Sequence, residues 1–400
     1  MKVLFVHNNY PGQFIHLAKA LAGHATVAAI ASAPSGPPRD DVELLTYRVP
    51  DQDLSAAHPF ARRFEAECRR AEQVIYAASA LKSSGFLPDI TIVHPGWGES
   101  LPIRDLFPDT KLLVYCEYFY KNAGADFGFD PEFPRGGIDS LVKVSLLNAA
   151  SLLAMVGADK LFCPTLWQRQ LFPDPFKDRI DVLHEGVDTE AAKPNASAEI
   201  TVGSRRLRAG DEVVTFVARN LEPVRGYHVF MRALPEVLKR RPNAQALIVG
   251  GSGVSYGASP PAGRTWKDVF LDETAADLDL GRVHFTGPLS HGDFLRVLQV
   301  SSAHVYLTYP FILSWSMLEA MSAGCLVIGS ETGPVAEVIQ DGVNGLLTPF
   351  LEHEALAERI VRCLATPKRF RHLREAARRT VLDRYDLNIC LPRLLDYVRS

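Results

Sequence analysis

The sequence predicts an α/β fold built as two doubly wound domains, each with a parallel sheet covered by helices. Three observations predict it. Short apolar runs alternate with helical stretches in both halves of the chain. The 400 residues exceed what one core usually supports. A polar stretch without periodicity lies between Asp188 and Asp211. We therefore expect an N-terminal domain at 1–190, a C-terminal domain at 191–380 and a helical tail at 381–400.

The first domain is predicted to open with a buried strand, a turn and a helix. Val3–Val6 is apolar throughout, His7–Gly12 carries turn residues, and Gln13–Ala22 has helical spacing. Further strands ended by loop residues are expected at 26–31, 90–94 and 111–115. The first half is therefore α/β.

The second domain repeats this order of elements. Strands are expected at 213–217, 246–249, 282–285, 304–307 and 326–328, separated by helical stretches such as 227–240. Ligands of such folds bind beyond the carboxyl ends of the strands. Two facing sheets would place a cleft between those ends, so we look for function there.

Composition excludes several classes of protein. The 43 Lys and Arg residues are balanced by 46 Asp and Glu, so no basic field for nucleic acid is expected. The six cysteines form no CxxC pair, which argues against a zinc site or a disulfide framework and favours a reducing compartment. The apolar run at the N-terminus, Val3–Val6, is too short for the core of a signal segment. We expect a soluble, cytoplasmic protein, and peripheral contact with a membrane stays open.

The most informative segment is 307–324, which predicts a strand end, a loop and a helix. Ser314 or Ser316 can cap that helix, and free N–H groups at its start would attract an anion such as a diphosphate. Glu319, about one turn inside, can accept hydrogen bonds from ribose hydroxyls. A plain strand, helix and strand with an exposed glutamate explains the pattern equally well.

Two arginines follow the strand expected at 213–217. Arg219 and Arg225 lie in a loop just ahead of a helix, where guanidinium groups can clamp phosphate oxygens. Either arginine alone is more simply explained as a solvated loop residue. Their presence together at one strand end favours the clamp.

Three other signals are weaker. Asp277-Leu278-Asp279 matches a DxD metal signature, but a solvated helix end explains it better. Gly251-Ser252-Gly253 follows a strand without opening a helix, which argues against NAD. His94 ends a strand and can contact donor or acceptor, although a structural histidine is at least as well supported.

Taken together, the chain resembles the retaining GT-B glycosyltransferases of glycosyltransferase family 4. The resemblance covers nearly the whole length. It is carried by Pro11-Gly12, Cys163-Pro164-Thr165, His184 to Asp188, Arg219 to Gly226, Val283 to Gly287, Leu318 to Met321 and Gly342 to Gly345.

The resemblance implies two Rossmann-like domains facing across a cleft, with the acceptor side in the N-terminal domain and the donor side in the C-terminal one. The tail would return to the first domain. The implied reaction moves a hexose from a nucleoside diphosphate sugar with retention of α-configuration, without a metal or other cofactor. The implied donor contacts are Arg219 and Arg225 to the diphosphate, the backbone of Leu313, Ser314, Trp315 and Ser316, Glu319 to ribose, and Gly12 for close approach of the first loop.

Three departures from the family pattern affect the chemistry. Phe311 stands where the first of two glutamates is expected, so contacts to the sugar change and a deoxyhexose would suit the ring. Alternatively, Phe311 turns into the core of the second domain, as is common for phenylalanine at a strand end, and other groups hold the sugar. Glu117 or a neighbour takes the place of a histidine. Arg225 replaces a lysine and the segment from Arg219 is one residue longer.

Alternatives to transfer stay open. A GT-B nucleotide-sugar epimerase would hydrolyse or isomerise the donor without an acceptor, and a catalytically inactive subunit would only bind sugar nucleotide. The acceptor is a glycan, a lipid-linked compound or a small molecule, and the aromatic segment 118–133 is expected to shape its pocket.

Overall fold

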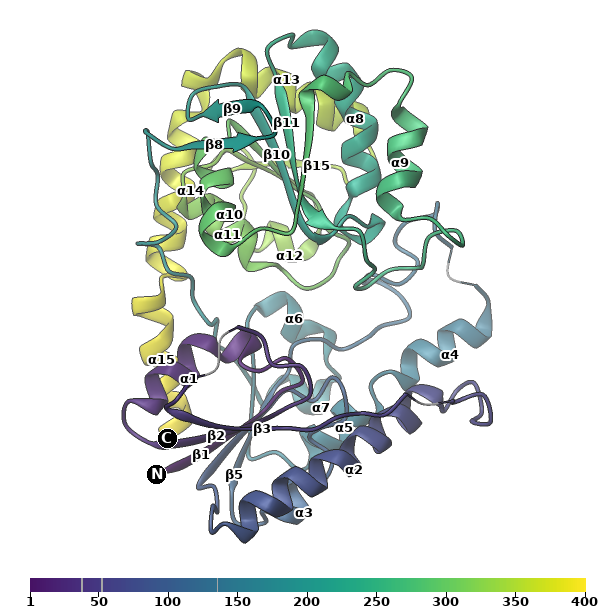
Figure 1. Ribbon diagram of the computed structural model, residues 1–400, viewed down its shortest axis with the longest axis vertical. Helices are drawn as coiled ribbons and strands as arrows, with labels where there is room; N and C mark the ends of the chain where they lie inside the picture. Colours follow the sequence, from purple (N-terminus) through teal and green to yellow (C-terminus); the bar gives the residue numbers. More distant parts are fainter. Residues whose placement is uncertain (37–38, 52, 135) are drawn as a thin grey trace. The chain divides into compact units, whose positions relative to one another are not determined.

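The chain folds into two compact α/β units. The structure is a computed structural model that describes residues 1–36, 39–51, 53–134 and 136–400. The first unit comprises Met1–Ala123, Arg135–Gly186 and Asn388–Ser400, and the second comprises Gly124–Pro134 and Val187–Leu387. Figure 1 shows the helices and strands of each unit.

Among the described residues, the first unit contains a seven-stranded sheet in the order β3-β2-β1-β4-β5-β6-β7. Every recorded pairing within it is parallel. The order reverses beside β1, as in doubly wound sheets. The strands are β1 Lys2–Val6, β2 Thr26–Ala31, β3 Val42–Thr46, β4 Ile90–Val93, β5 Lys111–Tyr115, β6 Lys160–Cys163 and β7 Ile180–Val182.

Helices cover both faces of this sheet. Along β1, Val3 and Phe5 pack into one core, and Leu4 and Val6 pack into the other, because side chains alternate along a strand. Helices α1 and α15 cover the first face, and α2, α3 and α5 cover the second (Figure 1). The helices are η1 Gly12–Phe14, α1 Ile15–Ala22, α2 Arg62–Ser83, α3 Ile103–Leu106, α4 Ile138–Leu146, α5 Ala149–Val156, α6 Leu166–Leu171, α7 Asp174–Lys177 and α15 Leu387–Arg399.

In the described part of the second unit, six parallel strands follow the order β12-β11-β10-β13-β14-β15, and a separate antiparallel hairpin pairs β8 with β9. The central strands are buried, as expected for a sheet covered on both faces. The strands are β8 Glu199–Val202, β9 Arg205–Arg208, β10 Val213–Asn220, β11 Gln245–Gly251, β12 Val283–Gly287, β13 Ala303–Tyr306, β14 Val327–Ser330 and β15 Leu346–Thr348.

Some helices of the second unit pack into two apolar clusters. One gathers α11, α14 and β14, and the other gathers α10, β10 and β11 with the hairpin. The helices are η2 Pro223–Arg225, α8 Tyr227–Arg240, α9 Trp266–Thr274, η3 Leu280–Arg282, α10 His291–Val300, α11 Trp315–Ser322, α12 Gly333–Ala336, α13 His353–Ala365, η4 Pro367–Phe370 and α14 Arg371–Arg384.

The structure departs from the sequence expectations in three places. The stretch 188–211 was expected to be irregular, yet it contains the hairpin of β8 and β9, turned at Gly203 with φ +59°. The tail is interrupted, since α14 ends at Arg384 and α15 begins at Leu387. Residues 124–134 fall inside the range expected for the first domain, but they fold with the second unit.

Candidate active site

The loop that follows β10, residues 221–226, holds Arg225 in one orientation, and we call it the arginine loop. Its Nη1 donates hydrogen bonds to Thr308 Oγ1 at 2.9 Å and to the Ile312 carbonyl at 3.0 Å. The guanidinium carbon lies 5.2 Å from the ring centre of Tyr256 and 5.6 Å from that of Phe311. A guanidinium has five N–H donors, so donors remain for an anion. Arg225 is therefore an oriented cation at the carboxyl end of the sheet.

Gly226 allows the arginine loop to pack directly on Leu307, the residue after β13. Its φ is +72°, and a Cβ there would lie 2.4 Å from the Cβ of Leu307. The Tyr309 N–H also donates to the Val224 carbonyl at 2.9 Å. Only glycine can adopt that backbone conformation without strain and, because it lacks a Cβ, leave room for so close a neighbour. Arg219, by contrast, is exposed near the end of β10.

Helix α11 begins where the sequence predicted. Ser314 is its N-cap and its Oγ accepts from the Ser316 N–H at 3.3 Å, while the Ser314 N–H donates to the Tyr306 hydroxyl at 2.8 Å. Two of the four backbone N–H groups predicted to meet the donor therefore have protein partners in this structure. Trp315 is the first helical residue, and Leu313 is 8% exposed.

Glu319 has a partner that the sequence did not indicate. Its Oε1 lies 2.6 Å from Nε2 of His291, the first residue of α10. This hydrogen bond raises the pKa of His291, which is 62% exposed at its side chain. Glu319 keeps 14% of its side-chain surface exposed, so it can still accept from a ligand hydroxyl.

Phe311 is buried beside the oriented arginine. It is 3% exposed, and its ring centre lies 4.9 Å from that of Tyr256. Both rings flank the Arg225 guanidinium. The structure thus brings Phe311 and Arg225 together, and places an apolar wall where the family pattern has an acidic side chain.

A buried glutamate shapes a loop that sequence reasoning passed over. Glu222 is 0% exposed, and its Oε2 accepts from three backbone N–H groups, of Ser255 at 3.1 Å, Tyr256 at 3.2 Å and Gly257 at 3.3 Å. Asn220 also binds this loop, through Ser255 Oγ at 2.6 Å. A glutamate directly before Pro223 was the available signal. These bonds position Tyr256 against Arg225.

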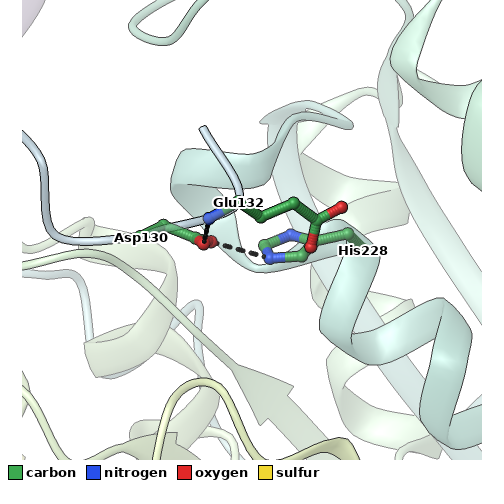
Figure 2. Close-up of side chains that lie close together, drawn as sticks. All are labelled: Asp130, Glu132 and His228. Carbon is green, nitrogen blue, oxygen red and sulfur yellow. Dashed lines mark hydrogen bonds and ion pairs between the residues drawn. The ribbon is translucent and has the colours of Figure 1, made fainter. Parts of the chain in front are cut away.

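Residues 124–134 are anchored on the second unit by an acidic pair (Figure 2). Asp130 Oδ2 accepts from His228 Nε2 at 3.0 Å and from the Tyr309 hydroxyl at 2.9 Å. Burial disfavours its charged form, but the bonds from His228, the Glu132 N–H and Tyr309 lower its pKa. Glu132 forms bonds of 2.7 and 2.8 Å with Arg232.

Asp130, Glu132 and His228 have the residue types of a metal site, and their ligand atoms lie within 4.8 Å of one another. Each carboxylate already accepts from protein donors, and His228 Nε2 faces Asp130. A cation would have to displace Arg232 from Glu132. The arrangement is better explained as an anchor for the segment. Phe133 completes it, with its ring centre 5.3 Å from that of Trp266.

The first unit carries a second polar cluster, at the ends of three neighbouring strands. His7 follows β1, His94 follows β4 and Glu117 lies two residues beyond β5. Glu117 Oε2 accepts from His94 Nε2 at 3.1 Å, and Glu117 Oε1 accepts from Gln13 Nε2. His7 Nε2 bonds Gln13 Oε1 at 2.8 Å. Parallel strands end at one edge, which explains why residues so distant in sequence meet.

Backbone donors fix the tautomers in this cluster. The Asn9 N–H donates to His7 Nδ1 at 2.9 Å and the Gly96 N–H donates to His94 Nδ1 at 3.1 Å. Each Nε2 therefore carries the proton when the ring is neutral. Burial and the neighbouring His94 lower the pKa of His7 to about 3. Burial opposes ionisation of Glu117, but the bonds from His94 and Gln13 lower its pKa, so it is a carboxylate at neutral pH.

Gly12 lies against His7 in this cluster. Its φ is +47°, and a Cβ there would lie 2.5 Å from His7 Cε1. Position 12 therefore needs a glycine because its backbone packs closely against the His7 ring of the protein itself. Trp97 packs over the cluster, with its ring centre 4.5 Å from that of His94 and 5.4 Å from that of His7. His7, Gln13 and Trp97 were not singled out from the sequence.

The weaker signals have structural explanations. Asp279 accepts from the Gly281 N–H and from Arg282, which makes it the cap of η3. Gly251 ends β11, and the next helix, α9, begins only at Trp266. Neither segment has the arrangement that a metal or dinucleotide site of the types considered would need.

Comparison with known proteins identifies relatives of both halves. Residues 22–192 match the family described as "Glycosyl transferase family 4 group", and residues 201–380 match the one described as "Glycosyl transferases group 1". The D-inositol 3-phosphate glycosyltransferase of Mycobacterium ulcerans (strain Agy99) is 30% identical over 172 residues, covering 42% of this chain and 34% of that protein. Its counterpart in Frankia alni is 27% identical over 255 residues, covering 62% and 58%. The matches thus span about a third to three fifths of these relatives.

Solved structures share the fold along the whole chain. Anabaena Alr3699/HepE in complex with UDP and glucose superposes with a TM-score of 0.68 at 17% identity, covering 100% of both chains. Sucrose-phosphate synthase from Thermosynechococcus elongatus gives a TM-score of 0.73 at 17% identity, covering 100% of this chain and 98% of that one. At these identities the likeness concerns the fold.

Proposed function

Because this chain belongs to the family 4 glycosyltransferases and folds as two Rossmann-like units of the GT-B type, we propose that it transfers a hexosyl group from a nucleoside diphosphate to an acceptor hydroxyl, with retention of α-configuration. The observation that carries the proposal is the oriented Arg225 guanidinium, fixed by Thr308 and Ile312 on the loop that leads into α11.

The donor diphosphate is proposed to bind the second unit. Negative charge grows on the diphosphate as the glycosidic bond breaks, and fixed cations stabilise that charge without reorganising. Arg225 supplies one such cation, exposed Arg219 supplies another, and the N-terminus of α11 adds a favourable dipole. Glu319 accepts from the ribose hydroxyls. With arginines serving as the counter-charge, we propose that no metal is required.

The acceptor side is proposed to lie in the first unit. Glu117 is a carboxylate held by two side-chain donors, so it suits the acceptance of a hydrogen bond from a sugar hydroxyl. Its lowered pKa makes it a poor general base, and we assign it to positioning and charge stabilisation. The structure records no disulfide among the six cysteines, all of which it describes, and this supports our proposal of a cytoplasmic location.

The donor and acceptor can be screened with a few compounds. The Anabaena relative was solved with UDP, so UDP-hexoses are the first donors to test, with a deoxyhexose donor beside them because of Phe311. Relatives named as D-inositol 3-phosphate glycosyltransferases make that compound the first acceptor to test. Release of nucleoside diphosphate together with an α-linked product is the expected result.

Two arginine variants with a matched control test the clamp. Arg219→Ala and Arg225→Ala should each lower kcat by about 10²–10³, the usual loss when a transition-state donor is removed. Arg264→Ala is the control, because Arg264 pairs with Asp272 on the surface. Equal losses in all three variants would reject the clamp. Activity in excess EDTA checks the proposal on metals.

The same assay separates the alternatives. Isomerised or hydrolysed donor without any acceptor would indicate an epimerase. Tight nucleotide binding without turnover across the donor panel would indicate a binding subunit, for which the loss of the family's acidic residue at Phe311 is the supporting observation.

A further inference from the structure

The first unit exposes an apolar stripe along α4 and α5. Ile138 is 72% exposed, Leu146 39%, Leu153 55% and Val156 69%. With the partly buried Val142 and Ala149, these residues recur every three or four positions. That spacing places them on one side of a helix. We call this set of six residues the α4–α5 stripe.

The two helices form one long apolar stretch. Ile138–Val156 spans 19 residues, with a mean hydropathy of 1.4 in its most apolar window and 28% of that window buried. By length and composition it is the one stretch among the described residues that could cross a membrane. A core helix of the same composition would be mostly buried, and a leader would lie near the N-terminus. Neither explanation fits this stretch.

The opposite side of α5 and the junction between the two helices are tied to the first unit. Ala154 and Met155 belong to its core, together with Val74 of α2. At the junction of the helices, Asn148 exchanges hydrogen bonds of 2.8 and 2.9 Å with the backbone of Tyr120. A segment fixed in this way cannot leave the unit to span a bilayer. It can only lie along a surface, over about 28 Å.

We propose that the α4–α5 stripe is the face by which the protein lies on a lipid bilayer, with its apolar side chains inserted at the boundary between headgroups and acyl chains. The four most exposed side chains present on the order of 400 Å², whereas a stable protein interface buries about 800 Å² on each partner. Insertion of side chains into lipid needs no minimum area, since each side chain contributes its own transfer free energy.

The charges beside the stripe indicate how binding depends on salt. Asp139 and Lys143 are both exposed on α4, and their charges cancel. Binding should therefore come from apolar insertion and persist at about 0.5 M NaCl, where charge attraction is screened. This inference is independent of the proposed sugar transfer, because vesicle binding needs no substrate.

The test is flotation of the full chain with vesicles of phosphatidylcholine containing phosphatidylglycerol. The stripe variant Ile138→Ser/Leu153→Ser/Val156→Ser should partition at least about 100-fold less, at about tenfold for each well-exposed side chain. The control Leu280→Ser/Val343→Ser/Leu351→Ser changes three apolar residues of the second unit that are 52%, 47% and 45% exposed, and should bind as the wild type does.

A second variant guards against loss of the helices. Ile138→Glu places an acid at the first residue of α4, where the helix dipole favours it, so folding is kept while insertion is opposed. It should also reduce flotation by about tenfold or more. The inference is overturned if the wild type does not float, or if the stripe variants float as well as the control. It is also overturned if the wild type binds no vesicles and light scattering shows that the wild type is a dimer whereas the stripe variants are monomers.

Discussion

Replacing Gly226 by alanine tests whether close packing of two loops orients the donor site. At φ +72° an alanine is strained by about 1–2 kcal/mol, because its Cβ crowds the following carbonyl. The same Cβ would lie 2.4 Å from Leu307 Cβ and 2.8 Å from Leu307 Cδ1. Leu307 is 2% exposed and cannot move into solvent, so overpacking adds about 1–3 kcal/mol. The expected destabilisation is about 2–5 kcal/mol.

Gly263 provides the matched control for this variant. Its φ is +75°, nearly that of Gly226, but a Cβ there would have no neighbour within 4 Å. Gly263→Ala should therefore cost only the backbone strain of about 1–2 kcal/mol. Urea unfolding measures both variants. Calorimetry with UDP adds a second measurement, because displacement of Leu307 shifts Thr308, the acceptor of Arg225. Equal destabilisation and equal UDP affinity in the two variants would refute the reasoning.

Three further predictions concern the site and its anchor. Glu319→Ala should weaken nucleoside diphosphate binding by about 1.5–3 kcal/mol in calorimetry, and an unchanged affinity would remove Glu319 from the ribose site. Phe311→Glu should reduce or invert a preference for a deoxyhexose donor in kcat/KM, whereas equal preference in wild type and variant would end that hypothesis. Asp130→Asn should lower the Tm at neutral pH. Because the folded state lowers the pKa of Asp130, its contribution is present above the ordinary value of 3.8 and is lost as pH falls below it, so the two Tm curves should converge in acid.

The parallel sheets were predictable because their strands are continuous apolar runs. Val3–Val6 and Val213–Val217 could be assigned without knowledge of their neighbours. The hairpin of β8 and β9 was missed because charged residues alternate with few apolar ones on an exposed pair of strands. Only Leu207 of β9 is buried, so the pattern carried little signal.

Residues near the site were predictable to different degrees. Arg225 comes after an apolar strand and Glu319 lies within a capped helix, and both elements can be located in the sequence. The partners of Glu117 and Glu319 could not be predicted, because Gln13 lies 104 residues from Glu117 and His291 lies 28 residues from Glu319. Contacts of that kind depend on which strands are neighbours in the sheet. Strand order is a property of the tertiary fold, which a local pattern does not contain.

The second unit is discontinuous in sequence, because it includes the segment 124–134. The polypeptide passes from one unit to the other after Ala123, Pro134, Gly186 and Leu387. A truncated protein spanning 187–387 would keep every strand of the second sheet, yet it would lose Asp130 and Phe133 and uncover His228, which is 1% exposed in the intact chain. Separate expression of a donor-binding fragment therefore requires the eleven-residue piece to be supplied as well, for instance as a synthetic peptide or grafted through a linker. The gene cannot be divided between the two units by a single cut.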